Sequence, residues 1–155
     1  MDVKYINPFL TATINVIKTM AFVEPKPGKP FIKKDKTALG DVSGIIGLSG
    51  DVTGTLSITF EEKTIKHILS NMFGEEVKEI NDEVRDGVGE LTNMICGDAR
   101  KLLQQQGINI KAAIPSIVSG KNHTIQHITA GPIIALPFTT EAGNFVVEFT
   151  FKKNN

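Results

Sequence analysis

The chain has 155 residues, which is enough for one domain from residue 1 to residue 155 with a sizeable apolar core. Lysine plus arginine and aspartate plus glutamate each number 17, so no net charge would attract nucleic acid or an anionic membrane. No apolar run approaches the roughly 20 residues that span a bilayer, and residues 1–9 lack the pattern of a signal peptide, so we expect a cytoplasmic protein that binds neither nucleic acid nor membrane.

The first predicted element is a helix that Asn7 caps, with Pro8 in the first helical position, and that runs to about Ala21. Residues 24–30 follow as a proline-rich connection. Five lysines lie between residues 26 and 36, and we interpret them as a solvated loop because the cluster lacks the regular interleaving of aromatic residues found in nucleic-acid platforms. The apolar stripe of the helix consists of Phe9, Ala12, Thr13, Val16, Ile17 and Met20.

Residues 41–60 predict a β-hairpin, because two segments rich in strand-forming residues meet at a turn over residues 48–51. The glycines of this segment match neither a dinucleotide-binding motif nor a P-loop, so we interpret them as tight turns and close sheet contacts. A second helix is predicted over residues 61–73, ended by Gly74 in a left-handed cap. Its buried side consists of Ile65, Ile68, Leu69 and Met72.

The longest predicted helix starts after Asn81 and ends near Gly107, and its residues divide into an apolar and a polar side. The core-facing stripe consists of Val84, Val88, Leu91, Ile95, Ala99 and Leu102. The exposed side carries Asp86, Glu90, Asn93, Gly97 and Gln104. Polar residues are common on a solvated helix, but each glycine in a helix interior costs about 1 kcal/mol relative to alanine. The glycine one turn beyond Asn93 would leave room for a groove or for the backbone of a partner.

The remainder of the chain is predominantly strands, predicted at residues 112–118, 124–129, 132–138 and 145–151, with a turn at residues 141–144. The order of elements hints at an internal duplication. Aligning Asn15 with Asn93 matches Ile17 to Ile95 in the two apolar stripes. Because Ala12 then stands where the second copy has glutamate, only the second copy carries a complete Glu-x-x-Asn pair.

The sequence predicts no metal site and no thiol chemistry. Cys96 is the single cysteine and lies beside the apolar stripe of the long helix, so we expect it to pack in the core. His123 and His127 are four residues apart, but their context is strand-like and supplies no third ligand. His67 stands alone on the second helix, which favours a surface or boundary position.

The sequence GELTNMICGDAR at residues 89–100, with Asp86 upstream and IPSIV at residues 114–118 downstream, resembles the CheC/CheX family of chemotaxis phosphatases. The single Glu-x-x-Asn helix, formed by Glu90 and Asn93, points to the CheX type. The resemblance covers nearly the whole chain. It implies an α/β (α+β) fold with two related halves, in which a mainly antiparallel sheet packs with long helices, and a homodimer that pairs through its sheets.

The resemblance also implies a phosphatase that hydrolyses the aspartyl phosphate of a CheY-like response regulator. Asn93 would hold the attacking water in line with phosphorus, because a carboxamide both donates and accepts hydrogen bonds. Glu90 would dock to a lysine of the receiver domain. Asp86, Gly97 and Arg100 would contact the partner. We expect no cofactor of the protein's own, since the magnesium ion would belong to the receiver.

Two other interpretations stay open. The same fold family includes flagellar switch components, so the chain could be a non-catalytic module that binds a response regulator. The intact pair of Glu90 and Asn93 argues against that interpretation. The substrate could also be a receiver in a pathway that controls something other than motility, and the sequence does not choose between receivers.

Overall fold

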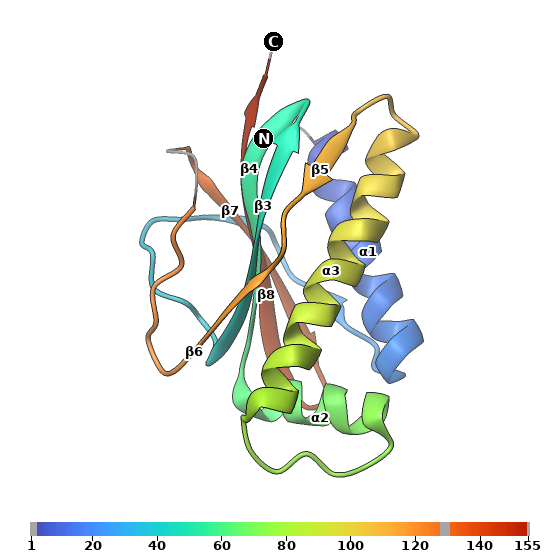
Figure 1. The fold of residues 1–155 in the computed structure, drawn as a ribbon, viewed down its shortest axis with the longest axis vertical. Helices are drawn as coiled ribbons and strands as arrows, with labels where there is room; N and C mark the ends of the chain where they lie inside the picture. The colour runs from blue at the N-terminus through green and yellow to red at the C-terminus, as the bar shows by residue number, and fades with distance from the viewer. Residues whose placement is uncertain (1–2, 128–130, 155) are drawn as a thin grey trace.

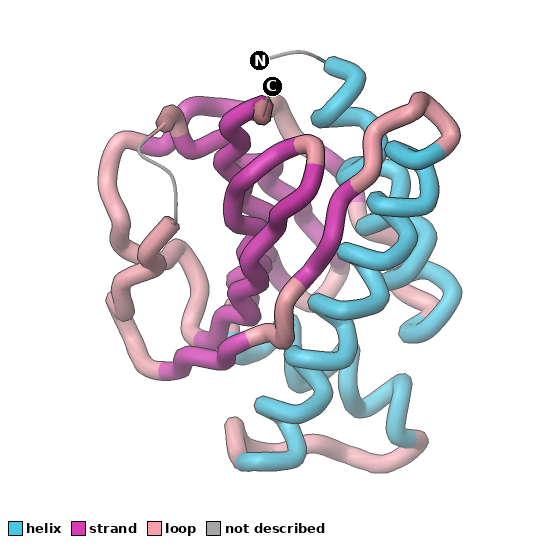
Figure 2. The backbone as a smooth tube through the Cα atoms, turned by 45° about the horizontal axis from the view of Figure 1, so that its top comes forward, coloured by secondary structure: helices cyan, strands magenta, loops and turns pink. Residues whose placement is uncertain are grey.

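Helices α1 (Val3–Ala21) and α3 (Asp82–Gln104) lie side by side on one face of an eight-stranded antiparallel sheet in the computed structural model, which describes residues 3–127 and 131–154 (Figure 1). Helix α2 (Glu62–Phe73) crosses the end of this layer, at the bottom of Figure 1. Figure 2 shows the same separation of helices from strands in a tilted view. The arrangement confirms the predicted fold class, a mainly antiparallel sheet packed with long helices.

The sheet has the strand order β1-β7-β8-β4-β3-β5, with β2 also paired to β7 and β6 also paired to β3. The strands are β1 (Lys26–Pro27), β2 (Phe31–Lys33), β3 (Val42–Gly50), β4 (Val52–Phe60), β5 (Ile110–Ala112), β6 (Ser116–Ser119), β7 (Ile133–Thr140) and β8 (Gly143–Lys153). The predicted hairpin is confirmed as β3 and β4, joined at Asp51. Gly50 has a φ of 104°, a backbone conformation that glycine adopts without steric cost.

One face of the sheet forms the apolar core because side chains alternate between the two faces of each strand. On β8, Phe145, Val147 and Phe149 point to the helices and are buried. The ring of Phe149 stacks on Phe9 of α1, with 5.3 Å between the ring centroids. Burying an aromatic side chain stabilises the fold by about 1.5–3 kcal/mol, so this layer holds α1 on the sheet.

Helix α3 buries the predicted stripe against the sheet and α1. Val84, Val88, Leu91, Ile95 and Ala99 are buried, as predicted. The prediction for the last stripe residue was wrong, because Leu102 is only half-buried and Leu103 takes the core position. The reason is that the buried face is wider than one stripe: Thr92, Cys96, Ala99 and Leu103 form a second buried row at spacings of four, three and four residues.

The caps of the helices agree with the sequence. The Asn81 Oδ1 accepts a hydrogen bond from the Val84 backbone N–H at 3.0 Å, which fixes the start of α3. Gly74 ends α2 in the left-handed region with a φ of 73°, and its N–H donates to the carbonyl of Ser70. Both boundaries were predicted from these residues.

The predicted start of α1 was wrong, because the helix already includes Val3 and Pro8 lies inside it. Proline has no N–H to donate to the carbonyl of Lys4, so the first turn lacks one hydrogen bond. Tyr5 stabilises this first part of the helix, since its side chain is buried and its ring centroid lies 5.5 Å from that of Phe151. The predicted end at Ala21 is confirmed.

Two strand predictions also needed correction. Residues 112–118 do not form one strand but the ends of β5 and β6, interrupted at Pro115, which has no N–H for a sheet ladder. Of the strand predicted at residues 124–129, the described part contributes only an isolated bridge between Thr37 and Thr124, and residues 128–130 lie outside the described residues. The short strand β1 lies in the segment that was predicted to be a connection, and β2 lies among the lysines that were interpreted as a solvated loop.

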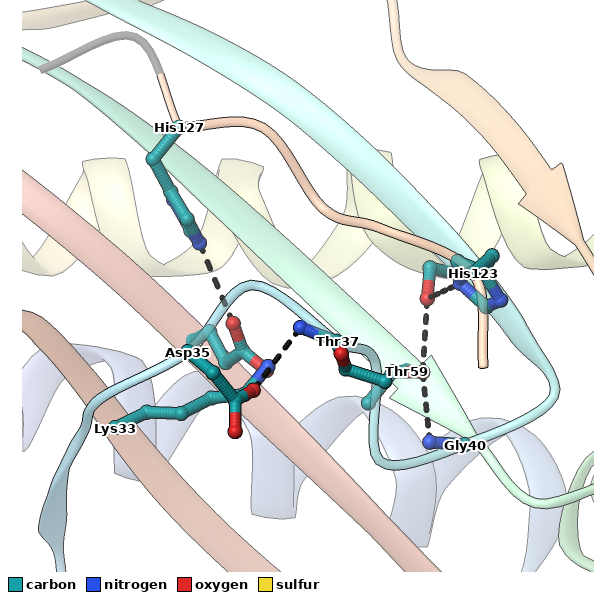
Figure 3. Close-up of polar contacts among 9 residues, drawn as sticks. Lys33, Asp35, Thr37, Gly40, Thr59, His123 and His127 are labelled. Atoms are coloured by element: carbon teal, nitrogen blue, oxygen red, sulfur yellow. Dashed lines mark hydrogen bonds and ion pairs between the residues drawn. The ribbon is translucent and has the colours of Figure 1, made fainter. Parts of the chain in front are cut away.

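The sheet face opposite the helices is polar and nevertheless buried. Ser57 of β4 and Glu148 of β8 are register partners on this face and are fully buried. Residues 34–41 and 120–127 cover it, as the hydrogen bond from the Gly40 N–H to Thr59 Oγ1 at 3.2 Å and the contact of His123 with Ser43 at 2.6 Å show (Figure 3).

A buried ion pair lies in this layer. The Lys33 Nζ donates to Glu148 Oε2 at 2.9 Å, and the two side chains are 5% and 0% exposed. His127 Nε2 lies 3.3 Å from the other oxygen of Glu148, so Lys33 and His127 converge on one carboxylate (Figure 3). The prediction that all five lysines of residues 26–36 are solvated was therefore wrong for Lys33. Its carboxylate partner lies 115 residues away in the chain, beyond the reach of a local pattern.

Cys96 packs in the core as predicted. Its side chain is buried, and burial raises the pKa of the thiol to about 11, opposed only in part by the positive charge of Arg100. A thiol with so high a pKa carries little of the thiolate that acts as a nucleophile. In the part of the chain that the structure describes, no helix is both long and apolar enough to cross a membrane.

Lys33→Ala should lower the free energy of unfolding by about 3 kcal/mol, because removing one partner of a buried ion pair leaves the other charge without compensation. The measurement is urea unfolding followed by circular dichroism. Lys34→Ala is the matched control, since Lys34 is the exposed neighbour on the same segment. Equal effects of the two substitutions would contradict the assignment of Lys33 to the buried pair.

Candidate functional site

The exposed side of α3 carries the two residues on which the predicted chemistry depends. Glu90 and Asn93 are three positions apart, a spacing that places both side chains on the same side of a helix. Both are exposed, while Leu91 and Thr92 between them are buried. The side chains of Glu90 and Asn93 make no hydrogen bond or ion pair to another described residue. Both side chains are therefore free to contact a partner.

A groove of about 420 Å³ runs between this side of α3 and the segment that joins β5 to β6. The helix forms one wall and residues 114–117 form the other. The groove is lined by Arg85, Asp86, Gly89, Glu90, Asn93, Met94, Ile114, Pro115 and Ile117. We call it the α3 groove.

The α3 groove contains three of the five predicted site residues: Asp86, Glu90 and Asn93. Gly97 lies one turn further along the helix, is exposed, and has no atom within 4 Å of the position that a Cβ would occupy. Arg100 lies beyond the groove, where its Nε donates to the carbonyl of Ile110 at 2.7 Å. That hydrogen bond ties the second half of α3 to β5.

The carboxylates that line the α3 groove have no basic partner among the described residues. Asp86 and Glu90 make no ion pair there. Arg85 is already engaged, since its Nη1 lies 2.9 Å from Asp82 Oδ1 and its Nε donates to Ser119 Oγ at 3.3 Å. The groove is therefore suited to a partner that presents a cation.

The apolar wall of the groove was not predicted as part of the site. Ile114, Pro115 and Ile117 were predicted as part of a strand and of the family motif, and Met94 lies between the buried and exposed sides of α3. The tertiary packing that brings residues 114–117 beside α3 has no local signal. The one available signal was an isoleucine directly before a proline, because proline has no N–H for a sheet ladder and so interrupts a strand.

The side chains that line the α3 groove include an amide and carboxylates but no serine, cysteine or histidine. An arrangement of this kind can orient a water molecule and bind a cation, whereas it offers no hydroxyl, thiol or imidazole nucleophile. Among the described residues, no group of three or more His, Cys, Asp or Glu side chains is placed to hold a metal ion. His123 and His127 lie on the opposite face of the sheet, in contact with Ser43 and Glu148.

Comparisons with known proteins find relatives that match nearly the whole chain. The chain is 27% identical over 140 residues to the CheY-P phosphatase CheX of Thermotoga maritima, and the match covers 90% of this chain and 89% of that protein. A crystal structure of a CheC-like superfamily protein from Shewanella sp. PV-4 is 51% identical, with a TM-score of 0.92 and coverage of 98% of this chain and 99% of that chain.

A crystal structure of the CheX-CheY-BeF3-Mg2+ complex from Borrelia burgdorferi is similar as well. It matches at 28% identity and a TM-score of 0.82, covering 96% of this chain and 98% of that chain. Residues 42–139 match the family of the chemotaxis phosphatase CheX, a range that includes α3 and both walls of the α3 groove. The chain belongs to the chemotaxis phosphatase CheX family.

Proposed function

We propose that this protein is a phosphatase that hydrolyses the aspartyl phosphate of a CheY-like response regulator in the α3 groove. The observation that carries the proposal is the exposed, unpaired pair of Glu90 and Asn93 in a chain of the CheX family. The relative from Thermotoga maritima is a CheY-P phosphatase, and the relative from Borrelia burgdorferi forms a complex with CheY. Hydrolysis of a response regulator's phosphate would take place in the cytoplasm.

Asn93 is the residue that we assign to the chemical step. An acyl phosphate is intrinsically labile, so the protein needs to position a water molecule more than it needs to supply a nucleophile. The carboxamide of Asn93 can accept a hydrogen bond from that water and donate one to a phosphoryl oxygen. It has no basic group, so it orients the water without taking its proton.

Glu90 would set the register of docking. Its carboxylate lies about one turn from Asn93 and has no ion pair of its own among the described residues. A receiver lysine next to the phosphoaspartate would neutralise it and thereby bring Asn93 to the phosphoryl group. The partner's magnesium ion would remain with the receiver, and this chain would need no cofactor of its own.

Asp86, Gly97 and Arg100 remain proposed partner contacts. Asp86 adds a second negative charge to the α3 groove, next to Glu90. Gly97 provides open space where a partner backbone can approach the helix. Arg100 would contact the partner only at the edge of the interface, since its guanidinium already donates to the carbonyl of Ile110.

We also propose a homodimer that pairs through the β2 edge of the sheet. Among the described residues β2 pairs only with β7, so its other side is an open edge. Phe31 and Ile32 on this strand are 42% and 60% exposed. An open edge with exposed apolar side chains favours pairing with a second chain.

Ile32→Lys should convert the dimer to a monomer, because a charged side chain on an edge strand opposes pairing between sheets. Light scattering coupled to gel filtration measures the mass. Leu39→Lys serves as the control, since Leu39 is similarly exposed but lies outside the strands. A dimeric Ile32→Lys variant would rule out this edge.

Asn93→Ala should lower the rate of receiver dephosphorylation at saturating protein by at least about 100-fold, because the positioned water is lost. Binding to the beryllofluoride-activated receiver should change little. The matched control is Asn15→Ala, which removes an exposed asparagine from α1 instead of α3. Full activity of Asn93→Ala would contradict the assignment.

Glu90→Gln should raise the KM for the phosphorylated receiver about tenfold and weaken the salt dependence of binding, because one charge pair is removed. Steady-state kinetics at two salt concentrations measure both effects. Glu83→Gln is the control, since Glu83 is exposed in the first turn of α3 and does not line the groove. An unchanged KM for Glu90→Gln would show that the carboxylate does not pair with the receiver.

A further inference from the structure

Ile114 is the most exposed large apolar side chain among the described residues. It is 89% exposed, compared with 81% for Phe22 and 60% for Ile32. It also lines the α3 groove, on the wall opposite Glu90 and Asn93. An isoleucine in that position does nothing for the core of this chain, so its contribution must be sought in what the groove binds.

The backbone on both sides of Ile114 is fixed to the same strand of the sheet. The N–H of Ala113 donates to the carbonyl of Gly47 at 3.0 Å, and Ser116 pairs with Ile45, both on β3. Pro115 restricts the preceding residue to extended conformations. Ile114 is thus an exposed side chain on an anchored backbone, and a held side chain loses less entropy on binding than one on a free loop.

Residues near Ile114 make this wall of the groove apolar and bring it close to α3. Pro115 and Ile117 continue the apolar surface. A Cβ at Gly89 would stand 3.5 Å from the Ile117 Cδ1 and 4.0 Å from the Pro115 Cγ, so the helix passes the wall at van der Waals distance there. The α3 groove therefore has one acidic wall and one apolar wall.

We propose that Ile114 is a docking residue that buries its side chain against an apolar part of the receiver surface beside the phosphoaspartate. The inference rests on the proposed function. Its occupant is the receiver domain because Ile114 lines the same groove as Glu90 and Asn93, so a partner that contacts the pair also covers this wall. The carboxylates of Asp86 and Glu90 make the groove unsuitable for an anionic membrane.

The acidic wall and the apolar wall of the α3 groove would recognise different features of the receiver. Glu90 selects a cation and fixes the register, whereas Ile114 supplies apolar contact area that depends little on salt. A receiver with a charged residue opposite Ile114 would be bound less well, since that charge would lose its water without gaining a partner. Ile114 thereby discriminates between receivers that share the same phosphorylation chemistry.

The test compares Ile114→Ala with the wild-type protein on CheY-like receivers of the source organism. Calorimetry gives the Kd for the receiver activated with beryllofluoride and Mg2+, and phosphate release gives kcat and KM. Ile114→Ala should raise Kd and KM about tenfold and leave kcat within about twofold, the pattern of lost docking. Leu39→Ala, which truncates an exposed residue outside the groove, should change neither value.

The two ways of failing are distinguishable. Wild-type protein that dephosphorylates the receiver while Ile114→Ala keeps the wild-type KM would overturn this inference and leave the proposed function intact. Wild-type protein that neither binds nor dephosphorylates any receiver would overturn both. An Ile114→Ala variant that changes the mass in light scattering at an unchanged KM would assign the residue to contacts between copies of this chain, against the proposal.

Discussion

The close packing of α3 on β3 is the constraint that gives this molecule its site. At Gly44 a Cβ would collide with Thr92 Oγ1 and would stand 3.3 Å from Val88, so only glycine allows the helix to approach the sheet this closely. Burial of Val88 and Leu91 then fixes the rotation of the helix about its axis. With that rotation fixed, the polar side of α3 points outward.

The two faces of the sheet differ in composition and in what they pack against. The helix face is apolar and positions α3, whereas the opposite face holds a buried polar layer around the ion pair of Lys33 and Glu148. Such a pair adds little net stability, because desolvation offsets attraction, but its carboxylate also contacts His127 of the segment that covers the face. The covering residues 120–127 follow β6 directly, and β6 continues from the apolar wall of the α3 groove. The polar layer thereby anchors the far end of the segment that forms this wall.

The local sequence pattern was sufficient to predict α3, its exposed pair and the hairpin of β3 and β4. Each of these depends on the spacing of residues that are close to one another in the sequence. The predicted start of α1 was wrong. The first residues of this helix contact the other end of the sequence, as Tyr5 and Phe151 show, and a local pattern does not reveal such a contact. The burial of Lys33 and the approach of residues 114–117 to α3 also depend on long-range packing. Glu90 and Asn93 were predictable as a pair, whereas the groove that surrounds them was not.

We infer that the α3 groove, with an unpaired carboxylate and a free amide, accelerates hydrolysis of a receiver's aspartyl phosphate. The most direct measurement is phosphate release under multiple turnover, with a phosphorylated CheY-like receiver in large excess over this protein and magnesium present. If the proposal is right, phosphate release is faster than the receiver's own hydrolysis, and its rate is proportional to the amount of protein added. Unchanged release from a receiver that demonstrably binds would contradict it and would identify the chain as a binding module.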